Sequence, residues 1–202
     1  MREKIVAVIL AGGAGRRMGS GAKPLRLLAG RPLVFRVAEA IGQQVDATVL
    51  NINDPADGYR GLGLPQVADS LAGRLGPLAG ILAGMDWTRD NHPDAKWLLS
   101  VPADAPFLPG DLVARFGREA RRSGAAHAHS GARDHPVVGL WPLARRDDLA
   151  DLLARGQRRA DSWTSLLAAG RVRWADANPD PFFNVNTPED LTKAELLCSL
   201  RG

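Results

Sequence analysis

The sequence has few of the features that indicate a disulfide-rich, membrane-spanning or nucleic-acid-binding protein. Its 202 residues include one cysteine, Cys198, which excludes a disulfide framework and a thiolate metal cluster. No apolar run approaches the roughly 20 residues that a membrane-spanning helix requires. The chain also lacks a long run of cations, and aromatic residues make up 5% of it, so a nucleic-acid surface is not indicated. We therefore expect neither a membrane nor a nucleic acid as a partner.

The remaining composition is that of an ordinary folded domain. Hydrophobic residues make up 45% of the chain and charged residues 24%, and the length is sufficient to bury one sizeable core. The net charge of +4 and the isoelectric point near 9.8 are compatible with an anionic substrate. The polar start, Arg2-Glu3-Lys4, leads directly into an apolar run and does not resemble a signal peptide, so the expected location is the cytoplasm.

Apolar runs and helical patterns alternate along the chain. This alternation predicts βαβ units, a mostly parallel sheet and a Rossmann-like three-layer α/β/α sandwich whose C-terminal half is mixed. We expect one domain over residues 1–202. The predicted strands cover residues 4–10, 46–52, 64–68, 97–101, 125–129, 136–141, 171–174 and 182–185, and the predicted helices cover 32–41, 77–85, 110–122, 146–155, 161–169 and a last one that begins after Thr187.

The most informative stretch runs from Leu10 to Leu25. It follows the first predicted strand with Ala11-Gly12-Gly13-Ala14-Gly15 and then supplies Arg16, Arg17 and Lys23. Small residues let a backbone approach a ligand closely, and free N–H groups in such a loop bind anions. Neither the P-loop spacing nor the Gly-x-Gly-x-x-Gly fingerprint is present, because no Gly-Lys pair occurs and Met18 stands at the third glycine position. The loop indicates a nucleotide site of another kind.

Polar residues follow the other predicted strands as well. Asn51 and Asn53 end the second, Asp69 follows the third, and Asp104 follows the fourth between Pro102 and Pro106. Ligands of open α/β sheets bind outside the carboxyl ends of the strands, so these side chains should meet at one edge. A fixed carboxylate with substrate phosphates nearby suits Mg²⁺, and Asp104 is the strongest candidate ligand.

Three further segments allow two interpretations each. Gly73 to Ile81 either seats a base against its backbone or packs a helix tightly. Arg133-Asp134-His135-Pro136 either faces a substrate or forms a hairpin turn. His127 and His129 resemble a metal pair without a third ligand, and two histidines on an exposed strand face are the favoured interpretation.

Taken together, these segments resemble a known family. Leu10-Ala11-Gly12-Gly13, Arg17-Met18-Gly19 and Lys23-Pro24-Leu25 are similar to the signature of nucleotidyltransferases that join a nucleoside triphosphate to a phosphate monoester. The ordered set that follows looks like the molybdenum cofactor guanylyltransferases: Asp69-Ser70, Gly76-Pro77-Leu78-Ala79-Gly80, Pro102-Ala103-Asp104-Ala105-Pro106, Arg133-Asp134-His135-Pro136 and Asn184-Val185-Asn186-Thr187-Pro188-Glu189-Asp190.

The resemblance implies a nucleotide-diphospho-sugar transferase-like fold, with a nucleotide-binding half over 1–110 and a pterin-substrate half over 111–202. It also implies transfer of GMP from GTP to molybdopterin, with transient contacts to apo-molybdoenzymes and other cofactor-biosynthesis proteins. Carried over by position, it implies these roles: Leu10, Ala11, Gly12, Gly13, Lys23, Asn51, Asp69 and Asp104 for the nucleotide; Arg17, Lys23 and Asp104 for catalysis; Asp104 for Mg²⁺; and His135, Asn184 and Asn186 for the pterin substrate.

Such a transfer needs no general base, because the attacking phosphate is already ionised near neutral pH. Catalysis then consists of positioning and of neutralising charge on the phosphates. Two alternatives stay open. One is a sister enzyme that transfers CMP to molybdopterin or a nucleotide to a sugar phosphate. By the resemblance, Gly13 favours a purine nucleotide and so argues against transfer of CMP. The other is a non-catalytic nucleotide-binding protein that delivers the cofactor.

Overall fold

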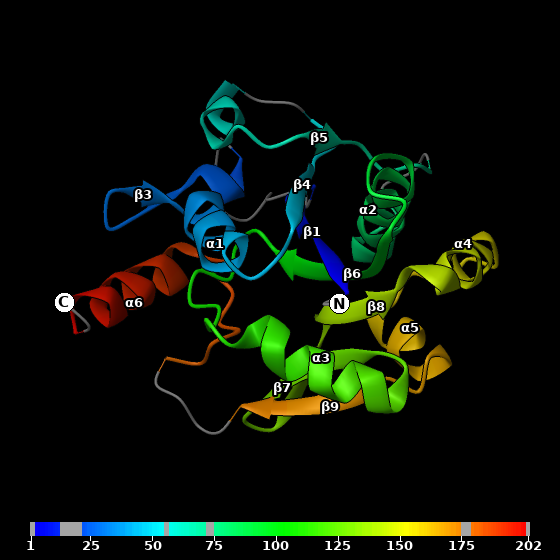
Figure 1. The fold of residues 1–202 in the computed structure, drawn as a ribbon. Coiled ribbons are helices and arrows are strands. Elements are labelled where there is room, and N and C mark those ends of the chain that lie inside the picture. The colour runs from blue at the N-terminus through cyan, green and yellow to red at the C-terminus, as the bar shows by residue number, and fades with distance from the viewer. Residues whose placement is uncertain (1–2, 13–21, 55–56, 72–74, 175–178, 201–202) are drawn as a thin grey trace.

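A seven-stranded sheet forms the centre of the protein (Figure 1). The computed structural model describes residues 3–12, 22–54, 57–71, 75–174 and 179–200. The strand order is β5-β4-β1-β6-β8-β7-β9, in which β5, β4, β1 and β6 are parallel, β8 is antiparallel to both its neighbours, and β9 is parallel to β7. The strands are β1 (Lys4–Leu10), β4 (Ala47–Asn51), β5 (Gln66–Val67), β6 (Ala95–Pro102), β7 (Ala126–Ser130), β8 (Arg133–Pro142) and β9 (Gly170–Trp174).

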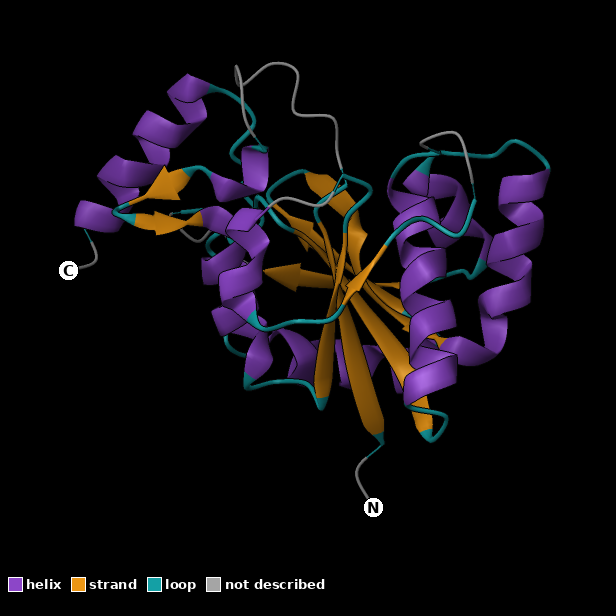
Figure 2. Cartoon of the chain, turned by 90° about the horizontal axis from the view of Figure 1, so that it is seen from above, coloured by secondary structure: helices purple, strands orange, loops and turns teal. Residues whose placement is uncertain are grey.

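Helices cover both faces of this sheet (Figure 2). On one face lie α1 (Leu33–Gly42) and α3 (Leu112–Ser123), and on the other lie α2 (Pro77–Asn91), α4 (Arg146–Ala154) and α5 (Ala160–Leu166). The predicted three-layer α/β/α sandwich with a mostly parallel sheet and a mixed second half is confirmed.

Strand β1 shows why the layers form. Its side chains alternate between the faces, so Ile5, Ala7 and Ile9 pack in the core under α1 and α3, whereas Val6 and Val8 pack under α2. A strand that is buried on both faces reads as a continuous apolar run, which is typical of parallel sheets. The run Ile5–Leu10 is of this kind.

The last helix, α6 (Pro188–Ser199), packs beside a small hairpin formed by β2 (Leu27–Leu28) and β3 (Arg31–Pro32). A separate apolar cluster joins them and includes Leu28, Leu33, Val185 and Ala194. Short 3-10 turns occupy Lys23–Leu25, Asp57–Leu62 and Leu143–Arg145. None of the helices in the described part of the chain is long and apolar enough to cross a membrane.

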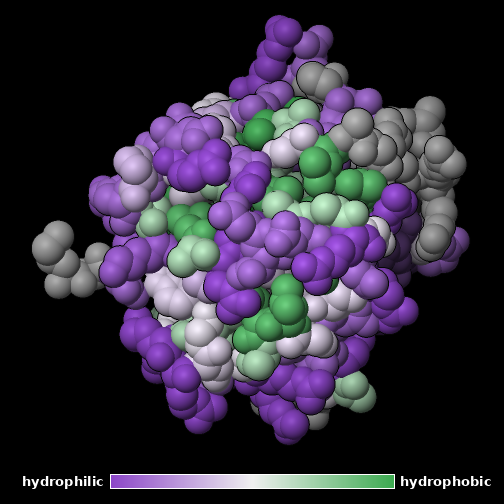
Figure 3. All heavy atoms as spheres, turned by 90° about the vertical axis from the view of Figure 1, so that its right-hand side faces the viewer, coloured by the Kyte–Doolittle hydropathy of each residue, from purple (hydrophilic) through white to green (hydrophobic). Residues whose placement is uncertain are grey.

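The side of the molecule that carries α2, α4 and α5 exposes separate apolar patches between hydrophilic residues (Figure 3). No continuous apolar face is visible there among the described residues. This agrees with the burial of the inward-facing apolar residues of α2, α4 and α5, such as Leu82, Leu149 and Trp163.

Three expectations about elements need correction. The predicted strand over 182–185 is wrong: the segment makes one backbone hydrogen bond, Val185 N to Asp104 O at 3.0 Å, instead of a ladder. The helix predicted to end at Ala169 stops at Leu166, and Ala168 has a φ of 48°, which a helix cannot continue. Helix α2 continues six residues beyond the expected Met85, to Asn91, because Thr88 is still buried.

Helix α6 begins with the predicted N-cap. The Thr187 hydroxyl accepts a hydrogen bond from Asp190 N, and the Asp190 carboxylate accepts from Thr187 N. Thr187→Ala should lower the free energy of unfolding by about 1 kcal/mol, because the cap is lost. Thr192→Ala on the same helix is the matched control and should change stability by less than about 0.5 kcal/mol. Urea denaturation measures both, and equal effects would contradict a capping role for Thr187.

Candidate active site

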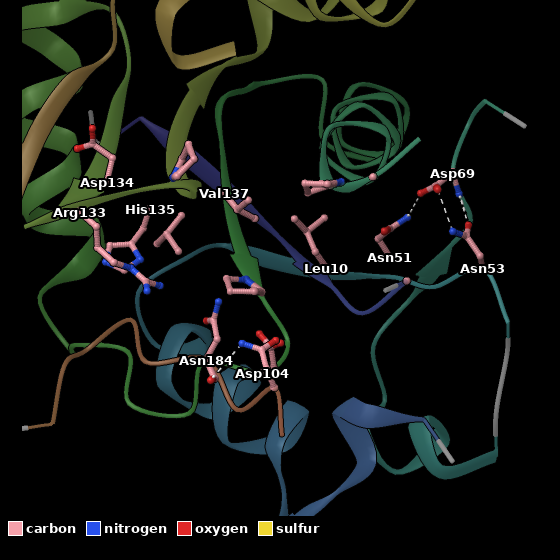
Figure 4. Close-up of a pocket in the computed structure, with 17 residues that line it drawn as sticks. Leu10, Asn51, Asn53, Asp69, Asp104, Arg133, Asp134, His135, Val137 and Asn184 are labelled. Atoms are coloured by element: carbon pink, nitrogen blue, oxygen red, sulfur yellow. Dashed lines mark hydrogen bonds between the residues drawn. The ribbon is translucent and has the colours of Figure 1, made fainter. Parts of the chain in front are cut away.

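The strand register places three residues in one row at the carboxyl edge of the sheet. Leu10 of β1 pairs with Asn51 of β4 on one side and with Pro102 of β6 on the other. All three line a cavity of about 620 Å³ (Figure 4). Because the three strands are parallel, Gly12, Asn53 and Asp104, which follow them, line the same cavity.

The other wall of this cavity comes from the second half of the chain. Strand β8 is antiparallel to β6, so its beginning, and not its end, reaches the carboxyl edge. Asn184 and Asn186, which precede α6, also line the cavity. In Figure 4, Asn184 lies below the labelled residues of β8. The remaining lining residues come from these strand ends and from the start of α2: Gly12, Asn53, Asp69, Gly76, Pro77, Asp104, Arg133, Asp134, His135, Pro136, Val137 and Val138.

Two asparagines fix the carboxylate of Asp69. Asn51 Nδ2 donates to Asp69 Oδ1 at 3.0 Å, and Asn53 Nδ2 donates to Asp69 Oδ2 at 2.8 Å. Asp69 N in turn donates to Asn53 Oδ1 at 2.9 Å. The three side chains therefore form one bonded group at the ends of β4 and β5, with its acceptors in the cavity wall (Figure 4).

Two glycines allow the chain to approach this group. A Cβ on Gly12 would lie 3.1 Å from Asn53 Nδ2 and 3.5 Å from Asn51 Oδ1. A Cβ on Gly80, in α2, would overlap the amide of Asn51 and lie 2.7 Å from Leu10 Cδ2. Of the two interpretations of the segment Gly73 to Ile81, whose residues 73–74 lie outside the described ones, close packing holds for Gly80, and it leaves room for Asn51.

Asp104 and Lys23 form an ion pair at the centre of the cavity edge. Lys23 Nζ also donates to Asn186 Oδ1 at 2.6 Å, so the lysine joins the loop after β6 to the segment before α6. The side chains of Lys23 and Asp104 are 13% and 17% exposed. Asp104 Oδ1 is buried and makes no hydrogen bond to any residue that the structure describes. One carboxylate oxygen is thus paired with a cation while the other lacks a bonded partner in the described structure.

His135 is buried in the opposite wall. Its Nε2 lies 2.7 Å from the hydroxyl of Ser130, and that hydroxyl donates to Asp180 Oδ1 at 2.7 Å. Burial, followed by the nearby charge of Arg133, lowers the pKa of His135 to about 4. The imidazole is therefore neutral at physiological pH. Neither Ser130 nor Asp180 is marked by any motif in the sequence, and the hairpin between β7 and β8 brings Ser130 to His135.

The expectation that His127 and His129 lie on an exposed strand face is wrong. His127 is 5% exposed because β7 is an inner strand between β8 and β9. His129 Nδ1 lies 2.8 Å from Asp134 Oδ1, and Arg171 donates to Asp134 Oδ2 at 2.7 Å. Burial raises the pKa of Asp134, but these hydrogen bonds outweigh it and hold the pKa below its usual value.

These contacts hold the beginning of β8 in place. Burial lowers the pKa of His127. The described residues contain no group of three His, Cys, Asp or Glu side chains that could hold a metal ion. The pair of histidines is therefore part of the wall that supports Asp134, and Asp134 itself lines the cavity.

Most of the residues singled out in the sequence meet at this cavity. Leu10, Gly12, Asn51, Asp69, Asp104, His135, Asn184 and Asn186 line it, and Lys23 borders it through Asp104 and Asn186. Ala11 N donates to Asn51 O at 2.9 Å, so this N–H extends the backbone ladder between β1 and β4. Gly13 and Arg17, which were also assigned roles, lie outside the described residues.

The cavity lies at the carboxyl edge of the parallel strands, and a closely packed glycine, a carboxylate and a lysine lie at its rim. These features define the class of protein, which is a nucleotide-binding α/β protein suited to phosphate chemistry. The comparisons narrow this class. Residues 7–172 match the family model described as the MobA-like NTP transferase domain. The chain belongs to this family of nucleotidyltransferases.

The similar proteins align with nearly the whole length of this chain. It is 48% identical to a protein of Rhodopseudomonas palustris (strain BisB5) named molybdenum cofactor guanylyltransferase, over 95% of this chain and 93% of the relative. A protein of the same name from Nitrobacter hamburgensis is 44% identical, over 96% and 95%. Among solved structures, molybdopterin-guanine dinucleotide biosynthesis protein A from Archaeoglobus fulgidus aligns with a TM-score of 0.72 and 25% identity, over 97% of this chain and 99% of that one.

The close approach of Gly80 to Asn51 leads to a first prediction for the site. Gly80→Ala should lower the free energy of unfolding by about 1–3 kcal/mol, because the added methyl forces Asn51 or Leu10 to move. Binding of a nucleoside triphosphate should weaken as well, measured by calorimetry. The matched control is Gly42→Ala, where a Cβ meets nothing within 4 Å. The control should leave stability equal or raise it by up to about 1 kcal/mol. A destabilised control or an unaffected Gly80→Ala would contradict the packing.

The neutral His135 makes stability depend on pH. An unfolded histidine titrates near 6.5 and the folded His135 at about 4, so the unfolded chain binds more protons between these values. The free energy of unfolding therefore falls as the pH decreases through this window. Between about pH 7 and about pH 4.5, His135→Gln should lose roughly 2 kcal/mol less stability than the parent. Denaturant titrations at the two pH values measure the difference, and equal losses would refute a buried neutral imidazole.

Proposed function

We propose that this chain transfers GMP from GTP to molybdopterin, forming molybdopterin guanine dinucleotide and pyrophosphate. The observation that carries the proposal is the position of Asp104 and Lys23 between two differently built walls of one cavity. The names of the similar proteins from Rhodopseudomonas palustris and Nitrobacter hamburgensis support the choice of GTP and of the molybdenum cofactor.

The two walls suit two substrates. In the half over 1–110, the approach of Gly12 to the group of Asn51, Asn53 and Asp69 offers backbone and acceptor atoms to a guanine nucleotide. Guanine carries N–H donors at its base edge, for which carboxylate and amide oxygens are suitable partners. In the half over 111–202, His135, Asn184 and Asn186 would face molybdopterin. The domain as a whole, 1–202, would act as one nucleotidyltransferase unit.

The arrangement around Asp104 fits a divalent cation. A buried carboxylate oxygen without a hydrogen-bond partner among the described residues is costly unless something binds it. Mg²⁺ is commonly held by one or two carboxylates together with substrate phosphates and water, so Asp104 would hold it here. Once bound, the ion would neutralise charge on the triphosphate.

Residues of the chain itself would stabilise charge in the transition state and position the substrates. A phosphate oxygen of molybdopterin forms a bond to the α-phosphorus of GTP while the bond between the α-phosphorus and the bridging oxygen breaks, and pyrophosphate leaves. Lys23 would release Asp104 and move to the phosphates, where a fixed cation stabilises the charge of the transition state. Arg17 would contribute a second cation. The walls hold both substrates in place, which accounts for a large part of such catalysis.

The nucleotide is the first point to test. Pyrophosphate release in the presence of molybdopterin and Mg²⁺ should be fastest with GTP, and CTP and UTP should be poor substrates. Preference for CTP would point to a cytidylyltransferase instead. GTP binding without pyrophosphate release would point to a cofactor-delivery protein. A cytoplasmic location and contacts with apo-molybdoenzymes stay predictions.

The ion pair leads to the central mutational prediction. Asp104→Asn and Lys23→Ala should each lower turnover by about 10²–10³-fold, because each removes a charge that acts on the reacting phosphates. Removal of divalent ions with EDTA should abolish turnover, and added Mg²⁺ should restore it in the parent. Circular dichroism and urea titrations check that both variants remain folded.

A second ion pair provides the control. Lys4 and Asp94 are joined at 2.5 Å near the opposite edge of the sheet, and their side chains are 52% and 59% exposed. Asp94→Asn and Lys4→Ala should keep turnover within about twofold, because an exposed pair contributes little. Near-normal turnover in the Asp104 and Lys23 variants would reject the proposed roles.

A further inference from the structure

Ser130, His135 and Asp180 form a hydrogen-bonded chain behind the cavity wall. Ser130 ends β7, His135 lies near the start of β8, and Asp180 precedes the segment that leads to α6. Ser130 and His135 are 4% and 6% exposed. The two hydrogen bonds of the serine hydroxyl, to His135 Nε2 and to Asp180 Oδ1, are both 2.7 Å long. In this chain of groups, His135 is the member that lines the cavity.

The number of protons decides the direction of both hydrogen bonds. An ionised carboxylate can only accept, so the single hydroxyl proton of Ser130 is directed to Asp180. Ser130 Oγ then has lone pairs left and no proton for the imidazole. His135 Nε2 must therefore carry a hydrogen and donate it to Ser130 Oγ. In a neutral imidazole this leaves Nδ1 without a proton, as an acceptor.

We propose that Ser130 and Asp180 are positioning residues that hold the proton of His135 on Nε2, so that Nδ1 accepts a hydrogen bond from an N–H or O–H group of the substrate that receives the nucleotide. This inference rests on the proposed function for the identity of that substrate. A pterin ring system carries both ring N–H groups and an exocyclic amine, and each of these is a suitable donor.

The same geometry excludes a nucleophilic role for Ser130. In a catalytic triad the histidine accepts the serine proton and the aspartate orients the histidine. Here the aspartate is bonded to the serine, and the histidine donates to it. The three residue types of a triad are present, but their order is that of a support for the imidazole.

The support is itself held by backbone and aromatic contacts. Phe182 N donates to Asp180 Oδ1 at 2.9 Å, so this carboxylate oxygen accepts two hydrogen bonds. The ring of Phe182 lies 4.9 Å from that of His135 and meets Trp174 edge-on at 5.0 Å. These contacts restrict both the position of Asp180 and the rotation of the imidazole.

A hydrogen-bond acceptor at His135 Nδ1 selects among substrates. A buried acceptor that loses its donor costs free energy, so a substrate that places an acceptor or an apolar group against Nδ1 is discriminated against. The selection acts on the substrate that receives the nucleotide and not on the nucleotide, because Asn51 and Asp69 lie on the other wall (Figure 4).

Nuclear magnetic resonance of the uniformly ¹⁵N-labelled full chain tests the proton position without any activity. We expect a His135 signal with the proton on Nε2 and none on Nδ1, assigned by its loss in His135→Gln. Ser130→Ala should broaden or remove the Nε2–H proton signal by faster exchange with water. A proton on Nδ1 in the parent would overturn the proposal, whether or not the protein transfers GMP.

Kinetics test the consequence for the substrate. Ser130→Ala should raise the KM for molybdopterin about five- to tenfold, the equivalent of one hydrogen bond, and leave the KM for GTP unchanged. If this variant does not fold, Asp180→Ala replaces it, since removal of the carboxylate that accepts from Ser130 frees the hydroxyl proton for the imidazole. The same shift in KM is then expected.

Ser100→Ala is the matched control. Ser100 is also buried on the sheet, and its hydroxyl likewise makes two hydrogen bonds, to Val137 O and from Trp141 Nε1. It should lose comparable stability but keep the His135 signal and the KM for molybdopterin within about twofold of the parent. An unchanged KM in both Ser130→Ala and Asp180→Ala, or an equal rise in the control, would overturn the proposal.

Discussion

The backbone ladder between β1 and its two parallel neighbours is the interaction on which the site depends. It sets Leu10 opposite both Asn51 and Pro102, and it continues beyond the strands with Ala11 N bonded to Asn51 O and Ala103 N bonded to Leu10 O. A slip of one residue would turn every side chain of β1 to the other face of the sheet. Because both faces are buried, the core holds this register, and the register in turn holds the amide and carboxylate groups at one edge.

The ion pair of Lys23 and Asp104 builds on that edge. Asp104 follows β6, Lys23 begins the 3-10 turn Lys23–Leu25, and Asn186 N donates to Asp190, which caps α6. Removing one partner of a largely buried pair leaves an uncompensated charge, so the pair is stable until another charge replaces one member. A triphosphate with its metal ion is such a replacement. The hydrogen bond from Lys23 to Asn186 joins the two halves of the chain, and in the proposed function the ion pair marks the position of the chemistry.

Much of the fold and of the nucleotide wall could be predicted from local patterns. Apolar runs predicted β1, β4 and β6, and polar residues directly after them predicted a common edge, because parallel strands end on the same side. The segment over 182–185 was mistaken for a strand because Phe182, Phe183 and Val185 have a high β propensity, whereas their burial comes from separate tertiary clusters. His127 was placed on an exposed face because one sequence does not reveal that β7 is an inner strand. Ser130 and Asp180 are 50 residues apart, and their bond depends on the hairpin and on the return of the chain beside it.

In the proposed function, one cavity joins a guanine nucleotide to molybdopterin at Asp104. The most direct test is to incubate the purified chain with GTP, Mg²⁺ and molybdopterin and to identify the products by mass spectrometry. The expected products are molybdopterin guanine dinucleotide and pyrophosphate in equal amounts. Unchanged molybdopterin, or a dinucleotide formed with CTP in preference to GTP, would contradict the proposed function.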